Sequence, residues 1–189
     1  MCGISGFVDH RKNTDNVVLE KMNRSMVHRG PDGEGYAFFD GGDASVGIGH
    51  RRLSIIDLTS TGSQPQSYLQ YHITYNGEIY NYAAIKIELE QKGHQFNTHS
   101  DTEVILHAFA EWGKQAVHRF IGMFAFVIYD DAEKKIYACR DRAGVKPLFY
   151  YHHQGLFLFG SELKVLMQHP AFEKNIDLDA VAAFMQFGY

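Results

Sequence analysis

Apolar and polar positions along the chain follow two spacings, one typical of strands and one typical of helices. The mostly apolar run Gly3–Val8 is short, which predicts a buried strand. Residues 15–27 instead carry apolar side chains three and four positions apart, from Val18 to Met26, which predicts an amphipathic helix. The chain therefore begins with a strand followed by a helix.

The same two patterns continue to the end of the chain. Asp-Gly-Gly-Asp at 40–43 lies between two β-like runs and is typical of a hairpin turn. Ser100, with Glu103 three residues later, has the pattern of a capping box at the start of a helix. The predicted strands are 3–8, 36–39, 45–48, 53–57, 123–129, 136–139, 148–151 and 156–159, and the predicted helices are 15–27, 82–92, 101–112, 161–168 and 179–187.

Hairpin turns between strands, with helices interspersed, predict largely antiparallel sheets with helices packed outside them. A length of 189 residues is that of one domain, and no repeat, low-complexity tract or linker divides it. The apolar-rich helix 179–187 has nothing after it to cover it. We therefore expect residues 1–189 to be the N-terminal part of a longer chain, although a docked terminal helix fits the same pattern.

Composition narrows the classes of partner. A net charge of −4 leaves no basic field for nucleic acid or anionic lipid, so neither is an expected partner. No apolar stretch approaches the roughly 20 residues of a membrane span, and charges at 9–12 follow the first apolar run too closely for a secretory signal. The cytoplasm is the simplest location. The 11 histidines show neither Cys-x-x-Cys nor His-Glu-x-x-His spacing, so no metal site is predicted.

Cys2 is the first reactive side chain, and removal of Met1 would make it the N-terminal residue. Its α-amine would then have a pKa of about 7.7–8.0 beside a thiol of about 8.5. Such an amine can take the thiol proton and activate the nucleophile for acyl transfer. The alternative is a small apolar residue at the chain end. Position 2 alone favours the alternative.

Asn76 and Gly77 are the next candidates. A side-chain amide next to a glycine N–H can supply two donors to one oxygen, as an oxyanion hole requires. The alternative is an ordinary turn, because Asn-Gly is a strong hairpin signal. The segment that follows has a helical pattern rather than a strand pattern, which disfavours a simple hairpin.

Charged residues suggest a substrate clamp. One of Arg51 and Arg52 could bind a carboxylate in bidentate fashion, and Asp101 could bind an ammonium group. Together they would recognise an α-amino acid. The alternatives are a solvated arginine pair and a carboxylate that merely favours a helix N-terminus. The segment His28–Gly33 could brace a turn or order a loop near the site, and bracing is favoured.

Taken together, these motifs resemble the class II glutamine amidotransferase domain, specifically the glutaminase half of the asparagine synthetase family, from end to end. The motifs are Met1-Cys2-Gly3-Ile4, His28-Arg29-Gly30-Pro31-Asp32, Arg52-Leu53-Ser54-Ile55-Ile56-Asp57, Gln64-Pro65, Asn76-Gly77-Glu78-Ile79-Tyr80-Asn81, Ser100-Asp101-Thr102-Glu103-Val104-Ile105, Gly122-Met123-Phe124-Ala125-Phe126, Arg140-Asp141-Arg142, Gly144-Val145-Lys146-Pro147-Leu148 and Ser161-Glu162-Leu163-Lys164. Ala143 and Gln66-Ser67 depart from the usual pattern.

The resemblance implies an α+β fold of the N-terminal-nucleophile hydrolase type, a four-layer αββα sandwich with two antiparallel sheets. It also implies roles for six residues: Cys2 as nucleophile, Asn76 and Gly77 as oxyanion hole, and Arg52, Glu78 and Asp101 as ligands of the glutamine α-carboxylate and α-amine. Arg52 is preferred over Arg51 because it immediately precedes Leu53-Ser54-Ile55. The implied reaction is hydrolysis of L-glutamine through a γ-glutamyl thioester.

In the family, the ammonia passes to a C-terminal synthetase domain that uses ATP and Mg²⁺, usually to amidate aspartate. The Ser-Gly-Gly-x-Asp loop of that domain is not in this sequence, so no cofactor is expected for residues 1–189. The acceptor stays open, since relatives act in polysaccharide and secondary-metabolite pathways. A catalytically silent module, a hydrolase of another amide, and a homodimer also stay open.

Overall fold

The structure is a computed structural model that describes residues 1–54 and 62–188. Within these residues, nine strands form two antiparallel sheets. The first sheet has the order β2-β3-β1-β9-β8 and the second has the order β4-β5-β6-β7. The strands are β1 Gly3–Asp9, β2 Gly33–Asp40, β3 Ser45–Arg52, β4 Gln66–Tyr68, β5 Tyr71–Ile79, β6 Gly122–Asp130, β7 Lys135–Arg140, β8 Phe149–His153 and β9 Leu156–Gly160.

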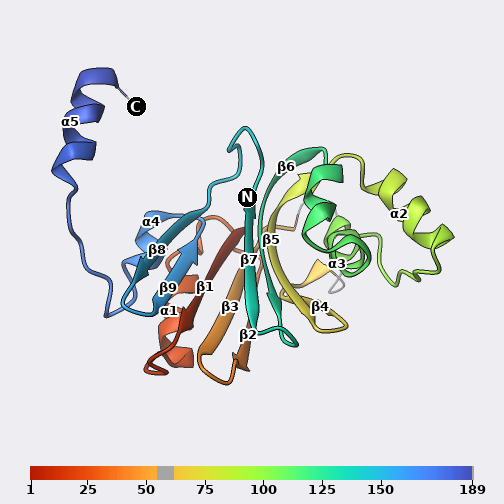
Figure 1. Cartoon of the computed structure of the whole chain (residues 1–189), viewed down its shortest axis with the longest axis horizontal. Coiled ribbons are helices and arrows are strands. Elements are labelled where there is room, and N and C mark those ends of the chain that lie inside the picture. Colours follow the sequence, from red (N-terminus) through yellow and green to blue (C-terminus); the bar gives the residue numbers. More distant parts are fainter. Residues whose placement is uncertain (55–61, 189) are drawn as a thin grey trace.

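Helices cover the two outer faces of the sheet pair (Figure 1). Helix α1 (Asn16–Arg24) packs on β1 and β3, and the short α4 (Leu163–Leu166) packs on β8 and β9. On the other sheet, α3 (Asp101–Trp112) packs on β4 and β5, with α2 (Tyr82–Gln91) and the 3-10 helix η2 (Gly113–Arg119) against α3. This helix–sheet–sheet–helix order confirms the predicted four-layer αββα sandwich.

Three apolar clusters correspond to the three interfaces between layers. One joins α1 and α4 to the first sheet, one joins α2 and α3 to the second sheet, and the third lies between the sheets. Strand alternation assigns each side chain to a layer. Phe7 of β1 therefore packs under α1, whereas Ile4 faces Ala125 and Val127 of the opposite sheet.

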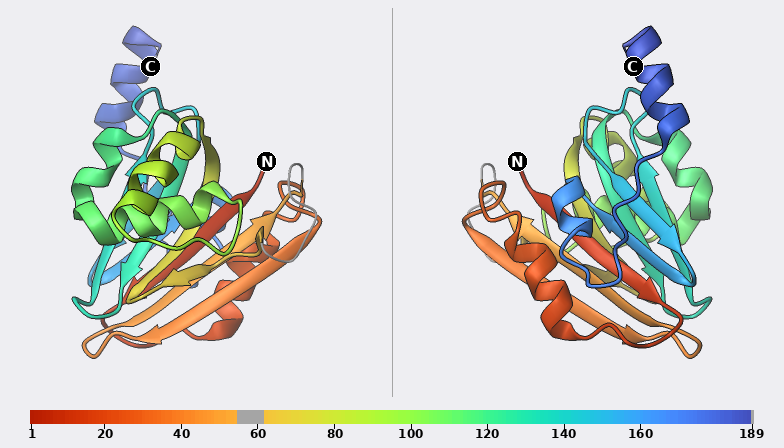
Figure 2. Two further views of the ribbon diagram at one scale, coloured as in Figure 1. Left: turned by 90° about the vertical axis from the view of Figure 1, so that its right-hand side faces the viewer. Right: turned by 90° about the vertical axis from the view of Figure 1, so that its left-hand side faces the viewer.

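Helix α5 (Leu178–Phe187) projects away from the sandwich (Figures 1 and 2). None of its residues is buried, and Leu178, Val181, Phe184, Met185 and Phe187 are exposed apolar side chains. It begins with Asp177, whose carboxylate accepts from the backbone N–H groups of Asp179 and Ala180. Within residues 1–54 and 62–188, no helix has the length and hydrophobicity needed to cross a membrane.

Most predicted elements are present, with four differences. Strand β5 is missing from the predicted elements, and the alternative of a turn at Asn76-Gly77 is wrong, because β5 continues through both residues to Ile79 and pairs with β6 to its end. The capping box is wrong in its second half. Ser100 Oγ accepts from Thr102 N, but Glu103 accepts from Asn97 N and Thr98 N rather than from Ser100.

The other two differences concern element lengths. The predicted helix 161–168 is reduced to the four residues of α4, because Ser161 still bonds to β1. Leu53 and Ser54 of the predicted strand 53–57 belong to no strand, and β3 ends before them at Arg52. Residues 55–57 of that prediction lie outside the described part of the chain.

Candidate active site

Cys2 lies directly before β1, at the edge of the space between the two sheets. Gly3 of β1 pairs with Arg51 of β3, so extending the register by one residue places Cys2 opposite Arg52. Facing residues in an antiparallel pair point to the same side of the sheet. Because the next inward pair is Ile4 with His50, the positions of Cys2 and Arg52 face the opposite sheet.

The backbone of Leu53 contacts the thiol. Leu53 N donates to Cys2 Sγ at 3.5 Å, and Cys2 Sγ lies 3.8 Å from Leu53 O. Both cysteines are half-buried. Burial raises the pKa of the Cys139 thiol to about 11. Since the thiolate is the nucleophile, Cys139 is a poor candidate for chemistry at neutral pH.

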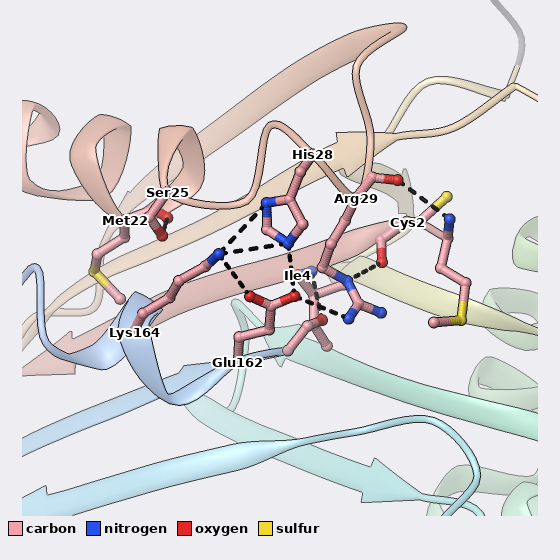
Figure 3. Close-up of polar contacts among 10 residues, drawn as sticks. Cys2, Ile4, Met22, Ser25, His28, Arg29, Glu162 and Lys164 are labelled. Carbon is pink, nitrogen blue, oxygen red and sulfur yellow. Dashed lines mark hydrogen bonds and ion pairs between the residues drawn. The ribbon is translucent and has the colours of Figure 1, made fainter.

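Arg29 fixes the main chain of Cys2 (Figure 3). Its Nε donates to Cys2 O at 3.0 Å, and its own carbonyl accepts from the Met1 ammonium at 3.2 Å. Sequence reasoning favoured a turn-bracing role for the 28–33 segment and missed this contact. The one signal for it was the place of Arg29 in a motif of the resemblance.

Glu162 holds Arg29 in turn. Its carboxylate accepts from Arg29 Nη1 at 3.2 Å, from His28 Nε2 at 2.9 Å and from Lys164 Nζ at 3.0 Å (Figure 3). Burial raises the pKa of Glu162, but the hydrogen bonds from Lys164, His28 and Arg29 outweigh burial and lower it to about 2. Glu162 is therefore ionised throughout the physiological range and keeps its charge beside Arg29.

Ser161 ties this cluster to the first strand. Ser161 Oγ accepts from Ile4 N at 3.0 Å, and Ser161 N donates to Ile4 O at 2.9 Å. The Ser161-Glu162 pair thus holds β1 two residues after Cys2 and, through Arg29, holds Cys2 itself.

The second half of the candidate site is the edge of β5 beyond β4. Pairing of β4 with β5 ends at Ile73, and side chains then take the place of a strand. Tyr75 N donates to Gln64 Oε1 at 2.7 Å, and Ile79 N donates to Asp101 Oδ2 at 3.0 Å. N–H groups two residues apart point to the same edge of a strand. The Gly77 N–H, midway between them, therefore points to this edge as well.

Glycine at position 77 is a requirement of close packing. A Cβ there would collide with the carbonyl oxygen of Met123 and lie 2.6 Å from Phe124 Cα. Phe124 directs its own N–H and C=O away from β5, to Asp141 Oδ2 at 3.2 Å and Asp141 N at 2.8 Å. The pair Gly77–Phe124 is thus a non-hydrogen-bonded pair, which agrees with an N–H directed outward.

Asn76 points into the space between the sheets, because it pairs with Ala125 of the inter-sheet cluster. The residue is 3% exposed, and its Nδ2 has no hydrogen-bond partner among the residues that the structure describes. A buried donor without a partner costs about 1–3 kcal/mol. Among the described residues, Asn76 Nδ2 shares this state with Arg29 Nη2, Ser45 Oγ and Tyr129 Oη. Asn76 Nδ2 and Gly77 N are adjacent donors, as the proposed oxyanion hole requires.

The structure gathers further predicted residues around Tyr75. Burial raises the pKa of Tyr75 well above its usual value, and the charges of Asp101, Glu78 and Cys2 add to that increase. Asp101 Oδ2 also accepts from Tyr75 Oη at 2.6 Å. Burial raises the pKa of Asp101 although these hydrogen bonds lower it. Asp101 is therefore a brace of β5 in addition to its predicted role as a substrate ligand.

The two arginines differ in their surroundings. Arg51 is buried, and its Nε and Nη1 donate to Gly30 O at 2.9 Å and Glu34 Oε2 at 2.5 Å, so it braces the turn before β2. Arg52 is half-buried at the end of β3, on the inward face. Glu78 is exposed and follows Asn76 by two residues on the same face of β5. Arg52 is thus the better placed of the two arginines to receive a carboxylate.

Metal ligands do not gather at this site. Among the described residues, no group of three or more histidine, cysteine, aspartate or glutamate side chains could hold a metal ion. The candidate site consists instead of a thiol, two amide donors and charged side chains.

Comparisons with known proteins agree with this arrangement. The sequence model of the glutamine amidotransferase domain matches residues 1–189. Asparagine synthetase (glutamine-hydrolyzing) 3 of Bacillus subtilis is 38% identical over 100% of this chain and 31% of its own length. Asparagine synthetase (glutamine-hydrolyzing) 3 of Arabidopsis thaliana is 40% identical over 88% of this chain and 28% of its own length. The chain thus spans about a third of these relatives.

Among solved structures, the glutamine phosphoribosylpyrophosphate amidotransferase of B. subtilis has a similar fold. Its TM-score is 0.74 at 22% identity, covering 88% of this chain and 43% of that one. At this identity the similarity is one of fold. The match to the domain over residues 1–189, supported by the similarity to asparagine synthetases over 88–100% of this chain, shows that the chain belongs to the glutamine amidotransferase domain family.

Proposed function

We propose that this domain hydrolyses L-glutamine to glutamate and ammonia through a thioester on Cys2. The observation that carries the proposal is the buried, unpartnered amide of Asn76 beside the outward Gly77 N–H. Asn76 faces the inter-sheet space on one sheet, as the position of Cys2 does on the other. Two such donors can stabilise an oxygen that acquires negative charge between them.

Removal of Met1 is the first step. Met1 is 56% exposed, so a peptidase can reach it. The freed α-amine of Cys2 takes the thiol proton, and the thiolate attacks the side-chain carbonyl carbon of glutamine. Asn76 Nδ2 and Gly77 N donate to the resulting oxyanion. The α-ammonium group returns its proton to the leaving nitrogen, ammonia departs and the γ-glutamyl thioester remains.

Water then completes the cycle. The α-amine of Cys2 accepts a proton from a water molecule, which attacks the thioester carbonyl, and the same two donors stabilise the second tetrahedral intermediate. The carbon–sulfur bond breaks, glutamate leaves and the thiol is regenerated.

Substrate recognition would use both sheets. Arg52 at the end of β3 would bind the α-carboxylate as a two-point donor. Glu78 and Asp101 would bind the α-ammonium group. The Asp101 Oδ2 atom already accepts two hydrogen bonds, so its second oxygen is the expected ligand. The alternative, a non-glutamine amide as substrate, applies if Arg52 or Asp101 does not line the pocket.

The wider reaction follows from the relatives. Because they are named asparagine synthetases and are about three times longer than this chain, we propose that the ammonia serves an ATP- and Mg²⁺-dependent synthetase domain that follows this one. Aspartate is the first candidate acceptor and other carboxylates are the alternative. No residue of this chain is assigned to ATP or Mg²⁺, and a cytoplasmic location and a homodimer stay predictions. The unpartnered Asn76 amide disfavours a silent module.

The test compares wild-type protein with Cys2→Ala. Purified wild type should release equimolar ammonia and glutamate from glutamine, and the variant should release neither above background. Intact mass should show that active protein begins at Cys2. Turnover by Cys2→Ala at the wild-type rate, or full activity of protein that retains Met1, would contradict the mechanism.

A further inference from the structure

His50 is a buried titratable residue for which the proposed chemistry has no use. It lies on β3 opposite Ile4 and is 1% exposed. Its Nε2 lies 3.2 Å from Tyr75 O, on the opposite sheet. Since a carbonyl oxygen can only accept, Nε2 carries the proton and donates. Burial, chiefly, lowers the pKa of His50 to about 3, so the ring is neutral at physiological pH.

The acceptor of this bond belongs to the peptide unit that precedes Asn76. Tyr75 C=O and Asn76 N–H share one plane, so a bond to the carbonyl fixes the plane from which the Asn76 side chain departs. Tyr75 N is held from the same edge by Gln64. The strand is thereby fixed on both sides of the Tyr75 Cα, directly before the two candidate oxyanion donors.

A second bond reinforces the first. Thr74 Oγ1 donates to Gly49 O at 3.0 Å, so residues 49 and 50 of β3 are bonded to residues 74 and 75 of β5. These adjacent bonds set the separation of the two sheets. On β3 they lie two residues before Arg52, whose position faces Cys2, and on β5 they lie directly before Asn76.

We propose that His50 is a positioning residue that holds the Asn76 and Gly77 donors at the correct distance from the Cys2 thiol, acting as a neutral hydrogen-bond donor. The inference rests on the proposed glutaminase function, because it assigns a role to the same site. It differs from a general-base role, since the proton on Nε2 is engaged by Tyr75 O and does not reach the substrate.

The experiment uses three substitutions in the Cys139→Ser background, so that Cys2 is the only thiol. Gln places an amide N–H near the position of Nε2, whereas Asn is too short and Leu has no donor. His50→Leu and His50→Asn should lower kcat for glutamine hydrolysis by roughly 10- to 100-fold, with KM changed by less than about 3-fold. His50→Gln should recover kcat to within about 5-fold of wild type.

A second measurement separates positioning from folding. Alkylation of Cys2 by iodoacetamide develops no oxyanion, so its rate should be the same in all four proteins. Glutamate γ-semialdehyde forms a hemithioacetal whose oxygen occupies the oxyanion site, so its affinity should fall in parallel with kcat. The pH dependence of kcat should keep its shape in His50→Gln, because a neutral donor has no titration to lose.

Wild-type kcat in His50→Leu would overturn the positioning role while leaving the glutaminase intact. Equal losses in the Gln and Leu variants, or loss of a pH limb in His50→Gln, would also overturn it. A parent protein that releases no ammonia would instead refute the proposed function. These failures are therefore distinguishable.

Discussion

The two sheets hold the two halves of the candidate site by different means. On the first sheet, Cys2 is fixed by a charged cluster of Arg29 and Glu162, with His28 and Lys164 at the surface. On the second sheet, Asn76 and Gly77 are fixed by buried hydrogen bonds to the backbone of β5 from Gln64, His50 and Asp101. One half depends on ion pairs and the other depends mainly on neutral donors and acceptors.

The difference follows from where each half lies in its sheet. Cys2 precedes the first ladder pair of β1, so no strand fixes its carbonyl and a side chain must do so. Asn76 and Gly77 lie inside a ladder that runs from Tyr71 to Ile79 on one side. Only their free edge needs support, and two of its three supports, Gln64 and His50, are neutral groups that avoid the desolvation cost of a buried charge.

The largest effect is expected at Asn76, whose side-chain Nδ2 has no hydrogen-bond partner among the described residues. Asn76→Ala should lower kcat by about 10²- to 10³-fold, because one oxyanion donor is lost. The same change should leave the free energy of unfolding equal or up to about 1 kcal/mol higher, since a buried unsatisfied group is removed. Ammonia release and urea denaturation measure the two quantities. A clear loss of stability would show that Asn76 is a structural residue.

The next largest effect is expected at low pH, which should destabilise the fold through its buried histidines and leave the charge of Glu162 unchanged. His50 has a folded pKa of about 3 and His107 one of about 4, both lowered chiefly by burial, below the unfolded value of 6.5. The stability that comes with their neutral forms is complete above pH 6.5. Below pH 6.5 the unfolded chain takes up protons that the folded chain does not, so the free energy of unfolding falls. Between pH 7 and pH 5 each should cost about 2 kcal/mol of stability. Over the same interval Glu162 should stay ionised, because its pKa is about 2.

Urea denaturation at pH 7 and pH 5 checks this expectation. His107→Gln should remove about 2 kcal/mol of the pH-dependent loss. A substitution at an exposed histidine, His152→Gln, serves as the matched control. An equal loss in His107→Gln and wild type would show that the buried histidines do not control acid stability.

Asp101 offers a way to separate bracing from binding. Asp101→Asn keeps an oxygen that can accept from Tyr75 and Ile79 but removes the charge. We expect KM for glutamine to rise on the order of 10-fold, with stability changed by less than about 1 kcal/mol. Tyr75→Phe removes one hydrogen bond and keeps the charge, so its KM should change less. An unchanged KM in Asp101→Asn would leave Asp101 as a brace alone.

The smallest effects are expected in the charged cluster. Glu162→Gln should lower kcat by roughly 5- to 10-fold with KM unchanged, because Arg29 loses its ion pair and holds Cys2 less firmly. Lys164→Met removes a partly exposed ion pair from the same carboxylate and should stay within about 2-fold of wild type. Equal losses in the two variants would show that the cluster acts as a whole and not through Arg29.

Much of the fold could be predicted, because its elements depend on local spacing. The short apolar run of β1 and the helical spacing of α1 predicted both elements to within a few residues. The course of β5 could not be predicted, because Asn-Gly favours a turn locally. Pairing with β6 outweighs that preference and keeps Asn76 and Gly77 in the strand. The capping box failed for a related reason, since Glu103 meets the preceding loop first.

The sequence by itself determined which reactive groups the chain carries: a thiol at position 2, the Asn76-Gly77 pair, and arginine and acidic candidates for an amino acid. Only the tertiary structure decided which groups support them. Arg29 reaches Glu162 across 133 positions, and His50 reaches Tyr75 across 25. Local periodicity specifies the face on which a side chain lies, but not which other face it meets. That is decided when burial of the apolar clusters brings the two sheets together.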